Sequence, residues 1–266
     1  GDIIAAALAT DMESQPDGTL LLDLGTNGEI LLKANNQFFA TSCATGPAFE
    51  GASLACGMQA TAGAINRVKI KDVHNYPEYT LVLPMETNHP TGICGTGVIS
   101  AIAELWRKRL ILNSGAFIND ETITPLQRDT REKFRYILVE GQPDSENEAI
   151  FISQKDIRAV QLGKAALSTG VDFLCKAAGY DELRKIIIAG AFGAYIDIED
   201  MITIGMIPDL DRKRVETAGN AAGAGAIMVL SDEYYLKKSV RIAEKTTTID
   251  LAANKSFQEV FVKRLG

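Results

Sequence analysis

The stretch Thr19–Leu32, with the sequence TLLLDLGTNGEILL, places a short polar turn between two apolar runs. Asp23 lies inside the first run, and burying a carboxylate without a partner is costly, so we expect a hydrogen-bond donor or a ligand there. A D-x-G-T turn between two strands can present backbone N–H groups and a hydroxyl to a phosphate, while its Asp holds Mg²⁺ through water. The alternative is an ordinary β-hairpin, because Asn27-Gly28 is a strong hairpin signal.

Three more glycine-rich turns are tied to helical patterns, at Gly92–Gly97, Gly190–Ala194 and Gly219–Ala226. Glycine at the start of a helix lets a ligand approach closely, and the helix N-terminus favours anions. Small residues at a helix start also serve close packing, so each turn has a purely structural alternative. None of the turns matches a G-x-x-x-x-G-K-[ST] phosphate loop or a dinucleotide-binding fingerprint.

The composition excludes several classes of protein. The chain has 266 residues, of which 46% are hydrophobic and 23% charged, as in ordinary globular proteins. Its net charge of −7 argues against a nucleic-acid binder. No apolar run approaches the roughly 18 residues of a membrane span, and no signal peptide is recognisable. Because the sequence starts at Gly1 with a helical pattern already over Asp2–Leu8, we expect a domain of a larger protein.

The cysteines and histidines do not have the spacing of a metal cluster. No C-x-x-C pair occurs, and the two histidines lie in a polar region; these residues are Cys43, Cys56, Cys94, Cys175, His74 and His89. We therefore expect separate buried thiols. Such cysteine usage fits a reducing cytoplasm, which is the location we expect.

The first part of the chain predicts a three-stranded meander. Its strands are Thr19–Leu24, Glu29–Ala34 and Gln37–Cys43, joined by the Asn-Gly turn and by a second turn at Asn35-Asn36. Small residues predict helical structure over Phe49–Ile65. A further strand is expected at Tyr79–Pro84, before the Gly92 turn and its helix.

The second part predicts alternating strands and helices. An irregular insertion at about 113–147, containing one strand at Phe134–Val139, precedes a long helix that starts at a Ser153/Asp156 capping box. The elements expected after it are a buried strand at Lys185–Ala189, a short helix near Ile198–Ile204, a strand at Arg214–Thr217, the Asn220 helix, a last helix pair and a short strand at Thr246–Asp250. The fold class is therefore α/β, with a mixed sheet, a β-meander and helices packed on it.

A D-x-G-T turn inside a β-meander, followed by strand–glycine turn–helix units, resembles the actin-like ATPase and sugar-kinase superfamily, whose lobes are ribonuclease-H-like. Within it, the chain is similar to the C-terminal domain of reductive activators of corrinoid proteins. Five motifs carry this resemblance: DLGTNGE from Asp23, GPAFEGA from Gly46, GICGTG from Gly92, AGAFG from Ala189 and GNAAGAGA from Gly219.

The resemblance implies an ATP- and Mg²⁺-dependent activator that returns the Co(II) corrinoid (cobalamin) protein of a methyltransferase system to Co(I). The corrinoid protein would be its partner, and neither nucleic acid nor a membrane is expected to be one. The apolar surface of such a domain is consistent with a homodimer. Electrons would come from an iron–sulfur domain of the parent protein. That domain and the superfamily's first phosphate loop are expected outside this chain, which by itself would then be inactive.

The resemblance also assigns roles to residues. Asp23 would be catalytic and would bind Mg²⁺ through water. The residues implied to bind the nucleotide are Gly25, Thr26, Asn27, Gly28, Gly95, Thr96, Gly97, Gly190, Phe192, Gly193, Asn220 and Gly223. Two alternatives stay open: a docking module without nucleotide use, and a small-molecule kinase, for which Glu29 and Glu50 are candidate bases.

Overall fold

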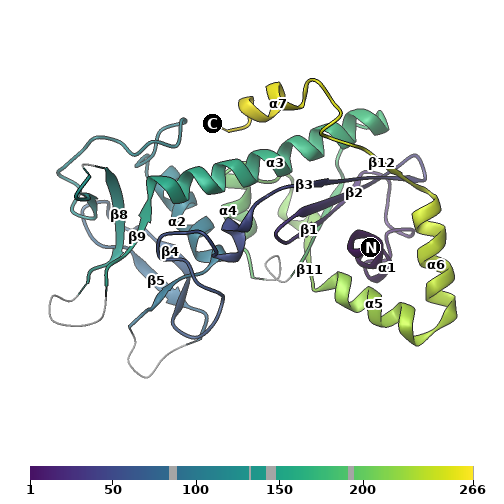
Figure 1. The fold of residues 1–266 in the computed structure, drawn as a ribbon, viewed down its shortest axis with the longest axis horizontal. Coiled ribbons are helices and arrows are strands. Elements are labelled where there is room, and N and C mark those ends of the chain that lie inside the picture. The colour runs from purple at the N-terminus through teal and green to yellow at the C-terminus, as the bar shows by residue number, and fades with distance from the viewer. Residues whose placement is uncertain (84–88, 132, 142–147, 191–194, 266) are drawn as a thin grey trace. The chain divides into compact units, whose positions relative to one another are not determined.

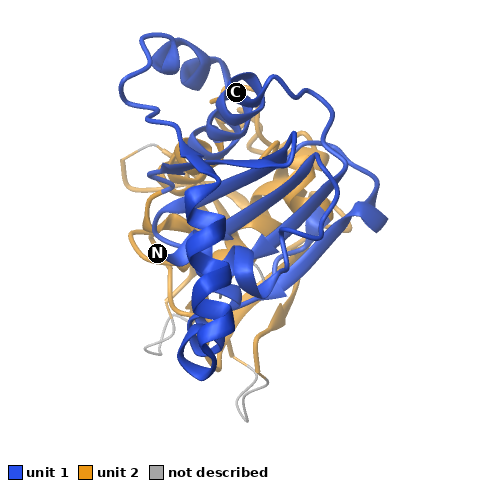
Figure 2. Ribbon diagram, turned by 90° about the vertical axis from the view of Figure 1, so that its right-hand side faces the viewer, with its two compact units in different colours: residues 1–45, 165–198, 207–264 blue, residues 46–164, 199–206, 265–266 orange. Residues whose placement is uncertain are grey.

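The computed structural model describes residues 1–83, 89–131, 133–141, 148–190 and 195–265 (Figure 1). The chain divides into two compact units, which Figure 2 shows in different colours. Unit 1 contains residues 1–45, 165–198 and 207–264, and unit 2 contains residues 46–164, 199–206 and 265–266. Most of unit 2 is therefore one continuous segment, residues 46–164, which follows the third strand of unit 1.

Unit 1 is built on a six-stranded sheet with helices on both faces. Its elements are α1 (Asp2–Ala9), β1 (Thr19–Leu24), β2 (Gly28–Ala34), β3 (Gln37–Cys43), the second part of α3 (Gln154–Ala178), β10 (Lys185–Ala189), η2 (Arg212–Arg214), β11 (Val215–Gly219), α5 (Ala221–Ser231), α6 (Glu233–Glu244), β12 (Thr246–Thr248) and α7 (Phe257–Lys263).

The strand order of this sheet is β11-β10-β1-β2-β3-β12. β1 pairs antiparallel with β2, and β2 with β3, whereas β1, β10 and β11 are mutually parallel. The Asn35-Asn36 turn between β2 and β3 has positive φ at both residues, 52° and 58°, as a two-residue type I′ hairpin requires. The predicted mixed α/β fold with a β-meander, the ribonuclease-H-like arrangement, is confirmed.

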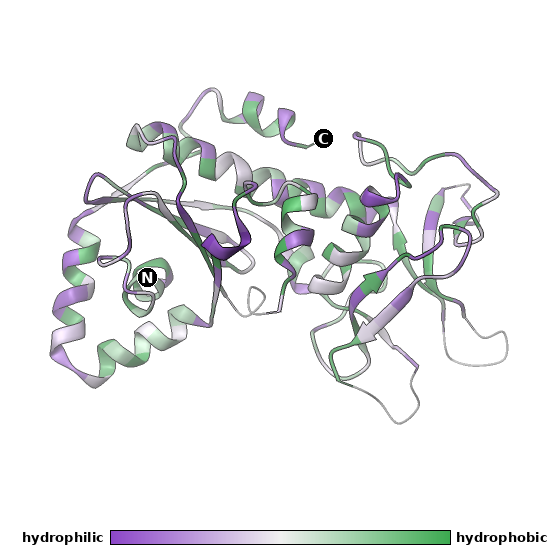
Figure 3. Cartoon of the chain, turned by 180° about the vertical axis from the view of Figure 1, so that it is seen from behind, coloured by the Kyte–Doolittle hydropathy of each residue, from purple (hydrophilic) through white to green (hydrophobic). Residues whose placement is uncertain are grey.

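Alternation along the strands divides the side chains between the two faces of the sheet. One face packs on α1, α5 and α6 through a core that includes Leu8, Leu21, Leu31 and Ile187. The other face meets α3, where a Cβ on Gly170 would lie 2.6 Å from Cδ1 of Ile30. α5 is hydrophobic along most of its length, whereas hydrophobic and hydrophilic residues alternate along α6 (Figure 3).

Unit 2 contains two small sheets and the helices that pack on them. Its elements are η1 (Pro47–Glu50), β4 (Ala64–Lys69), β5 (Glu78–Leu81), β6 (Gly92–Ile93), α2 (Gly95–Arg107), β7 (Leu126–Arg128), β8 (Phe134–Val139), β9 (Ile150–Ser153), the first part of α3, and α4 (Ile198–Thr203), whose first residue belongs to unit 1. The sheet orders are β5-β4-β6 and β7-β8-β9.

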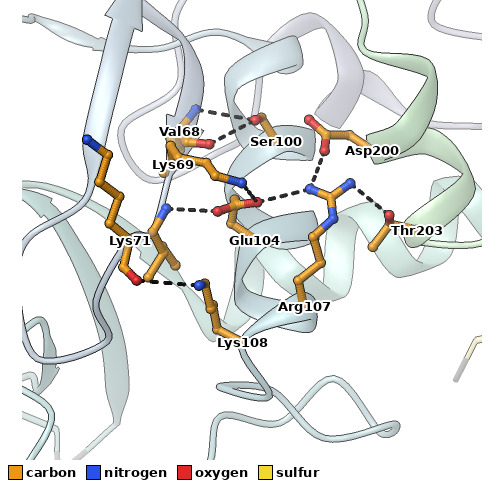
Figure 4. Close-up of polar contacts among 10 residues, drawn as sticks. Val68, Lys69, Lys71, Ser100, Glu104, Arg107, Lys108, Asp200 and Thr203 are labelled. Atoms are coloured by element: carbon orange, nitrogen blue, oxygen red, sulfur yellow. Dashed lines mark hydrogen bonds and ion pairs between the residues drawn. The ribbon is translucent and has the colours of Figure 1, made fainter.

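Ion pairs with two buried carboxylates, Glu104 and Asp200, join α2 to β4 and α4 in unit 2 (Figure 4). Glu104 is 1% exposed and accepts hydrogen bonds from the Ile70 N–H at 2.8 Å, from Lys69 at 3.2 Å and from Arg107 at 3.1 Å. Arg107 also donates to Asp200 of α4 at 2.6 Å. Since every partner of the Glu104 carboxylate is a donor, the negative charge is compensated where it is buried.

Two expectations for unit 2 need correction. The helix predicted over Phe49–Ile65 is wrong: only the short turn η1 is helical, and the end of this stretch enters strand β4. Its glycines make close backbone contacts, since a Cβ on Gly57 would lie 2.0 Å from the Gly51 oxygen, so their small size serves an irregular packed loop. The region 113–147 contains two strands, β7 and β8, where one was expected, and residues 142–147 lie outside the described residues.

The start of α3 agrees with the sequence. The Ser153 backbone N–H donates to Asp156 Oδ2 at 2.8 Å, and the Asp156 N–H donates to Ser153 Oγ at 3.2 Å, which together form the predicted capping box. Asp156 Oδ1 accepts a further hydrogen bond from the Ala55 N–H at 2.9 Å. The cap thus also anchors the irregular loop that precedes β4.

The cysteines and the helices bear on two other expectations. All four thiols are free; Cys43 and Cys94 are buried, and Cys56 and Cys175 are half-buried. Burial, with the nearby Glu29 carboxylate, raises the pKa of Cys43 to about 12, so this thiol stays neutral.

In the described part of the chain, each helix is too short or too polar to span a bilayer.

Candidate nucleotide-binding site

Asp23 lies near the carboxyl end of β1, on the face of the sheet that α1 covers. It is two residues from Leu21, which belongs to the core on that face, and the period of two in a strand gives both side chains the same direction. Asp23 is 8% exposed, and within the described residues its carboxylate has no hydrogen-bond or ion-pair partner. Of the two expectations for Asp23, a hydrogen-bond donor or a ligand, the described residues do not supply the donor, and the ligand stays a prediction.

Neighbouring carboxylates increase the negative potential at this position. Glu29 is opposite Asp23 in the β1–β2 register. Burial raises the pKa of Asp23, and the charge of Asp2 on α1 raises it further. Burial also raises the pKa of Glu29, followed by the effects of Asp23 and Asp2. The ionised forms of Asp23 and Glu29 are therefore disfavoured, so a cation at Asp23 would be stabilised by the surrounding negative charge.

The turn between β1 and β2 is held by its own backbone and by Thr45. The Gly25 N–H donates to the Asn27 oxygen at 3.1 Å, and Thr45 Oγ1 lies 3.0 Å from both the Gly25 and the Thr26 oxygens. Thr45 is 2% exposed, so this support comes from the interior. The turn is therefore held by a buried side chain on its inner side, while Asn27 is exposed to solvent.

The two glycines of the turn differ in what their missing side chains permit. A Cβ on Gly28 would lie 2.9 Å from Thr45 Cγ2, so Gly28 is required by packing. A Cβ on Gly25 would meet only the Asn27 oxygen, at 3.6 Å, and Gly25 does not have a positive φ. Neither packing nor backbone conformation requires glycine at position 25, which leaves room beside the turn for a ligand.

Gly190 follows β10 and lies beside the end of β1. The two strands are parallel with Ala189 opposite Asp23, and a Cβ on Gly190 would lie 2.3 Å from the Leu24 oxygen. Gly190 has a φ of +96° and donates from its N–H to the Gly219 oxygen at 2.9 Å. Gly190 is thus a structural necessity of the turn. The predicted nucleotide residues Phe192 and Gly193 lie outside the described residues.

The turn after β11 starts α5 through a side-chain cap. Asn220 is the N-cap, and its Oδ1 accepts a hydrogen bond from the Gly223 N–H at 2.9 Å. Gly225, one helical turn further into α5, packs against α1, since a Cβ there would lie 1.9 Å from the Ala5 oxygen. The motif therefore combines a side-chain cap at the helix start with a close helix crossing.

The parallel strands bring these segments to one edge of the sheet. Asp23, Gly190 and Asn220 each stand at or just beyond the carboxyl end of β1, β10 and β11, which are neighbours in the sheet. In α/β sheets, ligands bind at this edge. The turn residues Gly25–Gly28 extend it on the side of β2. Unit 1 thus assembles the described predicted residues other than Gly95, Thr96 and Gly97.

Those three belong to unit 2 and open α2, where all three are buried and packing requires Gly97. A Cβ on Gly97 would lie 2.2 Å from the Ile65 oxygen, so α2 contacts the backbone of β4 through this glycine. Thr96 is 8% exposed, and its Oγ1 is 3.2 Å from Cys94 Sγ. Their nucleotide role stays a prediction.

Sequence reasoning missed two contributors to the site, Thr45 and Asp2. The signal for Thr45 was its place directly before the Gly46-Pro47 turn, which fixes the chain as it leaves β3. The signal for Asp2 was an acidic residue in the first turn of a helix. Neither signal indicates which residues Thr45 or Asp2 lies near, because that proximity depends on the order of the strands.

The donor set fits Mg²⁺ bound together with a nucleotide. Within the described residues there is no group of three or more His, Cys, Asp or Glu side chains that could hold a metal ion. Mg²⁺ keeps several waters and commonly uses one or two carboxylates plus substrate phosphates. Asp23, which has no partner among the described residues, supplies one carboxylate beside the Gly25 turn, and nucleotide phosphates and waters would supply the other ligands.

Comparisons with known proteins show the family to which the chain belongs. Residues 17–266 match the family model described as the C-terminal domain of RACo, the ASKHA domain. The corrinoid activation enzyme RamQ of Eubacterium limosum is 36% identical over 252 residues, which are 91% of this chain and 42% of the relative. The [Co(II) methylated amine-specific corrinoid protein] reductase of Methanosarcina barkeri is 28% identical over 287 residues, covering 100% of this chain and 49% of the relative.

A solved structure is also similar. It is a reductive activator for corrinoid, iron–sulfur protein, with a TM-score of 0.87 and 33% identity, covering 98% of this chain and 41% of the other. The chain therefore spans less than half the length of each of these relatives.

Proposed function

The chain belongs to the family of C-terminal ASKHA domains of RACo, and from this we propose that it is the ATP-binding part of a reductive activator of corrinoid proteins. Its relatives are named as a corrinoid activation enzyme and a corrinoid protein reductase. Such an activator would return an oxidised Co(II) corrinoid protein of a methyltransferase system to Co(I). A role in corrinoid activation follows from the relatives, and the nucleotide and the reduction are the finer parts of the proposal.

One observation carries the nucleotide part: Asp23, at the carboxyl end of β1, is 8% exposed and has no partner among the described residues. The ribonuclease-H-like sheet alone would not require a carboxylate there, since the five other residues of β1 are Thr19, Leu20, Leu21, Leu22 and Leu24, all buried. A cation would compensate the charge that the protein leaves uncompensated. Asp23 is therefore best explained by a bound ion.

Each residue of the site would have its own role in binding the nucleotide. Asp23 would hold Mg²⁺ through water, and the Gly25–Gly28 turn would face the phosphates with its backbone. Gly190 and the start of α5 would border the nucleoside, and Asn220 would keep that helix start in place. Bound ATP supplies the free energy for an unfavourable electron transfer. The electrons would come from an iron–sulfur domain of the parent protein.

The partner would be a corrinoid protein, as the names of the relatives suggest. A cytoplasmic location and a homodimer stay predictions. The apolar side chains that a second copy could cover are exposed on α5 and α6, where Ile227 is 67%, Leu230 87% and Tyr234 60% exposed.

Calorimetric titration with a non-hydrolysable ATP analogue and Mg²⁺ tests the nucleotide site. We expect binding that weakens at least about tenfold in Asp23→Asn, the effect of one lost charge-assisted interaction. Glu244→Gln is the matched control, because Glu244 is an exposed carboxylate of unit 1 at the end of α6. Equal affinity of the wild type and Asp23→Asn would refute the role of Asp23.

The same titration should be repeated on the parent protein. Binding there and not in this chain would mean that further segments complete the site. If neither binds nucleotide while a corrinoid protein still binds, the chain is a docking module. Phosphoryl transfer to a small hydroxyl compound, lost in Glu29→Gln, would instead favour a kinase. Glu50, the other candidate base, is exposed in η1 of unit 2, and Glu29 is opposite Asp23.

A further inference from the structure

Unit 2 contains a cavity of about 200 Å³ among α2, α3, α4 and the segment 111–115. Most of its lining is apolar, including Ile102, Trp106, Ile111 and Ile157. Lys164 is the only cationic residue in the lining, and the lining has no carboxylate. This cavity lies outside the candidate nucleotide-binding site, which belongs to unit 1.

Lys164 has no partner of its own in the described part of the chain. It projects from α3, is partly buried, and makes no hydrogen bond or ion pair with a described residue. Burial lowers the pKa of Lys164, with no carboxylate nearby to oppose the effect. Its Nζ is 4.0 Å from the position of a Cβ on Gly205, where a glycine leaves open space. The protein thus keeps an uncompensated cation at a cavity wall, which costs stability.

Gln161 lines the same cavity one helical turn before Lys164. It is 7% exposed, and its Nε2 donates to the Leu265 oxygen at 2.8 Å. Its Oε1 is buried and accepts no hydrogen bond within the described residues. A second polar group of α3 at this cavity therefore also lacks part of its hydrogen bonding, which is unusual for an amide buried to this degree.

The opposite wall is fixed by ion pairing. Arg107 of α2 donates to Asp200 at 2.6 Å and to Thr203 Oγ1 at 2.8 Å, and Thr203 lines the cavity (Figure 4). Asp200 is 3% exposed, whereas the Arg107 side chain is 32% exposed, so the link is buried at its acidic end. Since α2 and α4 are held together in this way, the cavity exists before any ligand enters.

We propose that this cavity binds a small organic carboxylate, with its charged end at the Lys164 ammonium and its apolar body against Trp106 and Ile102. A single ammonium matches a single negative charge; a phosphate dianion would need further cationic donors, which the lining does not contain. The apolar wall favours a hydrocarbon or aromatic body over a sugar or a polar peptide.

Saturation-transfer NMR and calorimetry with phenylacetate test this proposal, with phenylacetamide as the neutral isostere. We expect the wild type to bind phenylacetate at least about tenfold more tightly than phenylacetamide, because only the carboxylate pairs with the ammonium. This comparison needs no variant, so it holds even if substitutions disturb folding. Equal binding of the two probes, or no phenylacetate binding, would overturn the proposal.

Lys164→Met keeps the apolar stem and removes the charge. We expect it to lose the preference for phenylacetate and to raise the melting temperature of the ligand-free protein. Lys155→Met is the matched control, because Lys155 is exposed on the same helix and does not line the cavity. Retention of the carboxylate preference in Lys164→Met, or its loss in Lys155→Met, would place the binding elsewhere.

Discussion

Asp23 and Glu29 lie directly opposite each other in the antiparallel β1–β2 pair, so two carboxylates share the face of the sheet that α1 covers. Like charges in opposed positions destabilise a strand pair. The arrangement therefore reduces the stability of the free protein at the point where the candidate site would hold a cation. Stability and binding are opposed at this position, and they can be measured separately.

The first prediction concerns the pH dependence of stability. Because the pKa of Asp23 is raised above its ordinary value of 3.8, the folded state binds more protons than the unfolded chain between that value and the raised one. Asp23 therefore lowers stability as pH rises through this window. We expect Asp23→Asn to melt roughly 2–4 °C higher than the wild type at pH 7.5, which corresponds to about 1 kcal/mol.

This advantage should disappear as the pH falls toward 3.8, where the wild-type carboxyl is also neutral. Thermal unfolding at several pH values measures the difference, with Glu244→Gln as the exposed control. A lower melting temperature of Asp23→Asn at pH 7.5 would show that the carboxylate has a stabilising partner.

The second prediction concerns the buried Glu104. Burial alone would raise the pKa of Glu104, but hydrogen bonds from the Ile70 N–H, Lys69 and Arg107 outweigh it and leave the pKa lowered. A lowered pKa stabilises the fold above the ordinary value of 4.5 and ceases to do so as pH falls through the lowered value. We expect Glu104→Gln to lose about 1.5–3 kcal/mol at neutral pH.

The loss should shrink below pH 4.5, and urea unfolding at two pH values measures it. Glu78→Gln is the control, because the Glu78–Lys71 pair is 62% and 69% exposed and such pairs contribute at most about 1 kcal/mol. Similar losses in both variants would contradict the role of burial.

The third prediction concerns the crossing of α1 and α5. Gly225→Ala would place a methyl group 1.9 Å from the Ala5 oxygen, so the helices would have to separate. We expect a loss of about 1–3 kcal/mol, as for other overpacked positions, although alanine favours an isolated helix. Ala226→Ser, on the exposed side of α5, should change stability by less than about 0.5 kcal/mol. An equally stable Gly225→Ala variant would show that the crossing is loose.

The strands of unit 1 could be predicted because their signals are local. Apolar runs ended by Asn-Gly and Asn35-Asn36 fix both hairpins, and the capping box fixes the start of α3 through residues three apart. The glycine motifs likewise marked the turns that follow β1, β10 and β11. The sequence alone could not show which glycines are required by packing. Gly225 allows a close helix crossing, whereas a Cβ on Gly25 would have a single neighbouring atom within 4 Å. That difference arises only when the strand order brings distant segments together.

Unit 2 was harder to predict for a related reason. β4 and β6 are short, and their pairing joins segments that are nearly thirty residues apart. The alanine- and glycine-rich sequence before β4 suggests a helix by composition, yet Gly51 and Gly57 are used for backbone contacts. Helix propensity is a weak prior when tertiary contacts decide the conformation. The cavity around Lys164 gave no sequence signal, because its walls come from three helices.

The last prediction separates ligand binding from folding within a single turn. Gly25→Ala adds a methyl group whose nearest neighbour is an oxygen at 3.6 Å, whereas Gly28→Ala pushes into Thr45, Leu167 and Cys43 at 2.9, 3.1 and 3.2 Å. We expect Gly25→Ala to keep the wild-type melting temperature and to weaken the binding of an ATP analogue. Gly28→Ala should lose about 1–3 kcal/mol of stability.

Differential scanning calorimetry and nucleotide titration of the same two samples give both readouts. The substitutions are chemically identical and three residues apart, so each serves as the control for the other. A phosphate that approaches the turn at Gly25 would collide with the new methyl group, which is why affinity should fall without a change in stability. Unchanged affinity in a stable Gly25→Ala protein would mean that the open space beside Gly25 is not where the phosphates bind.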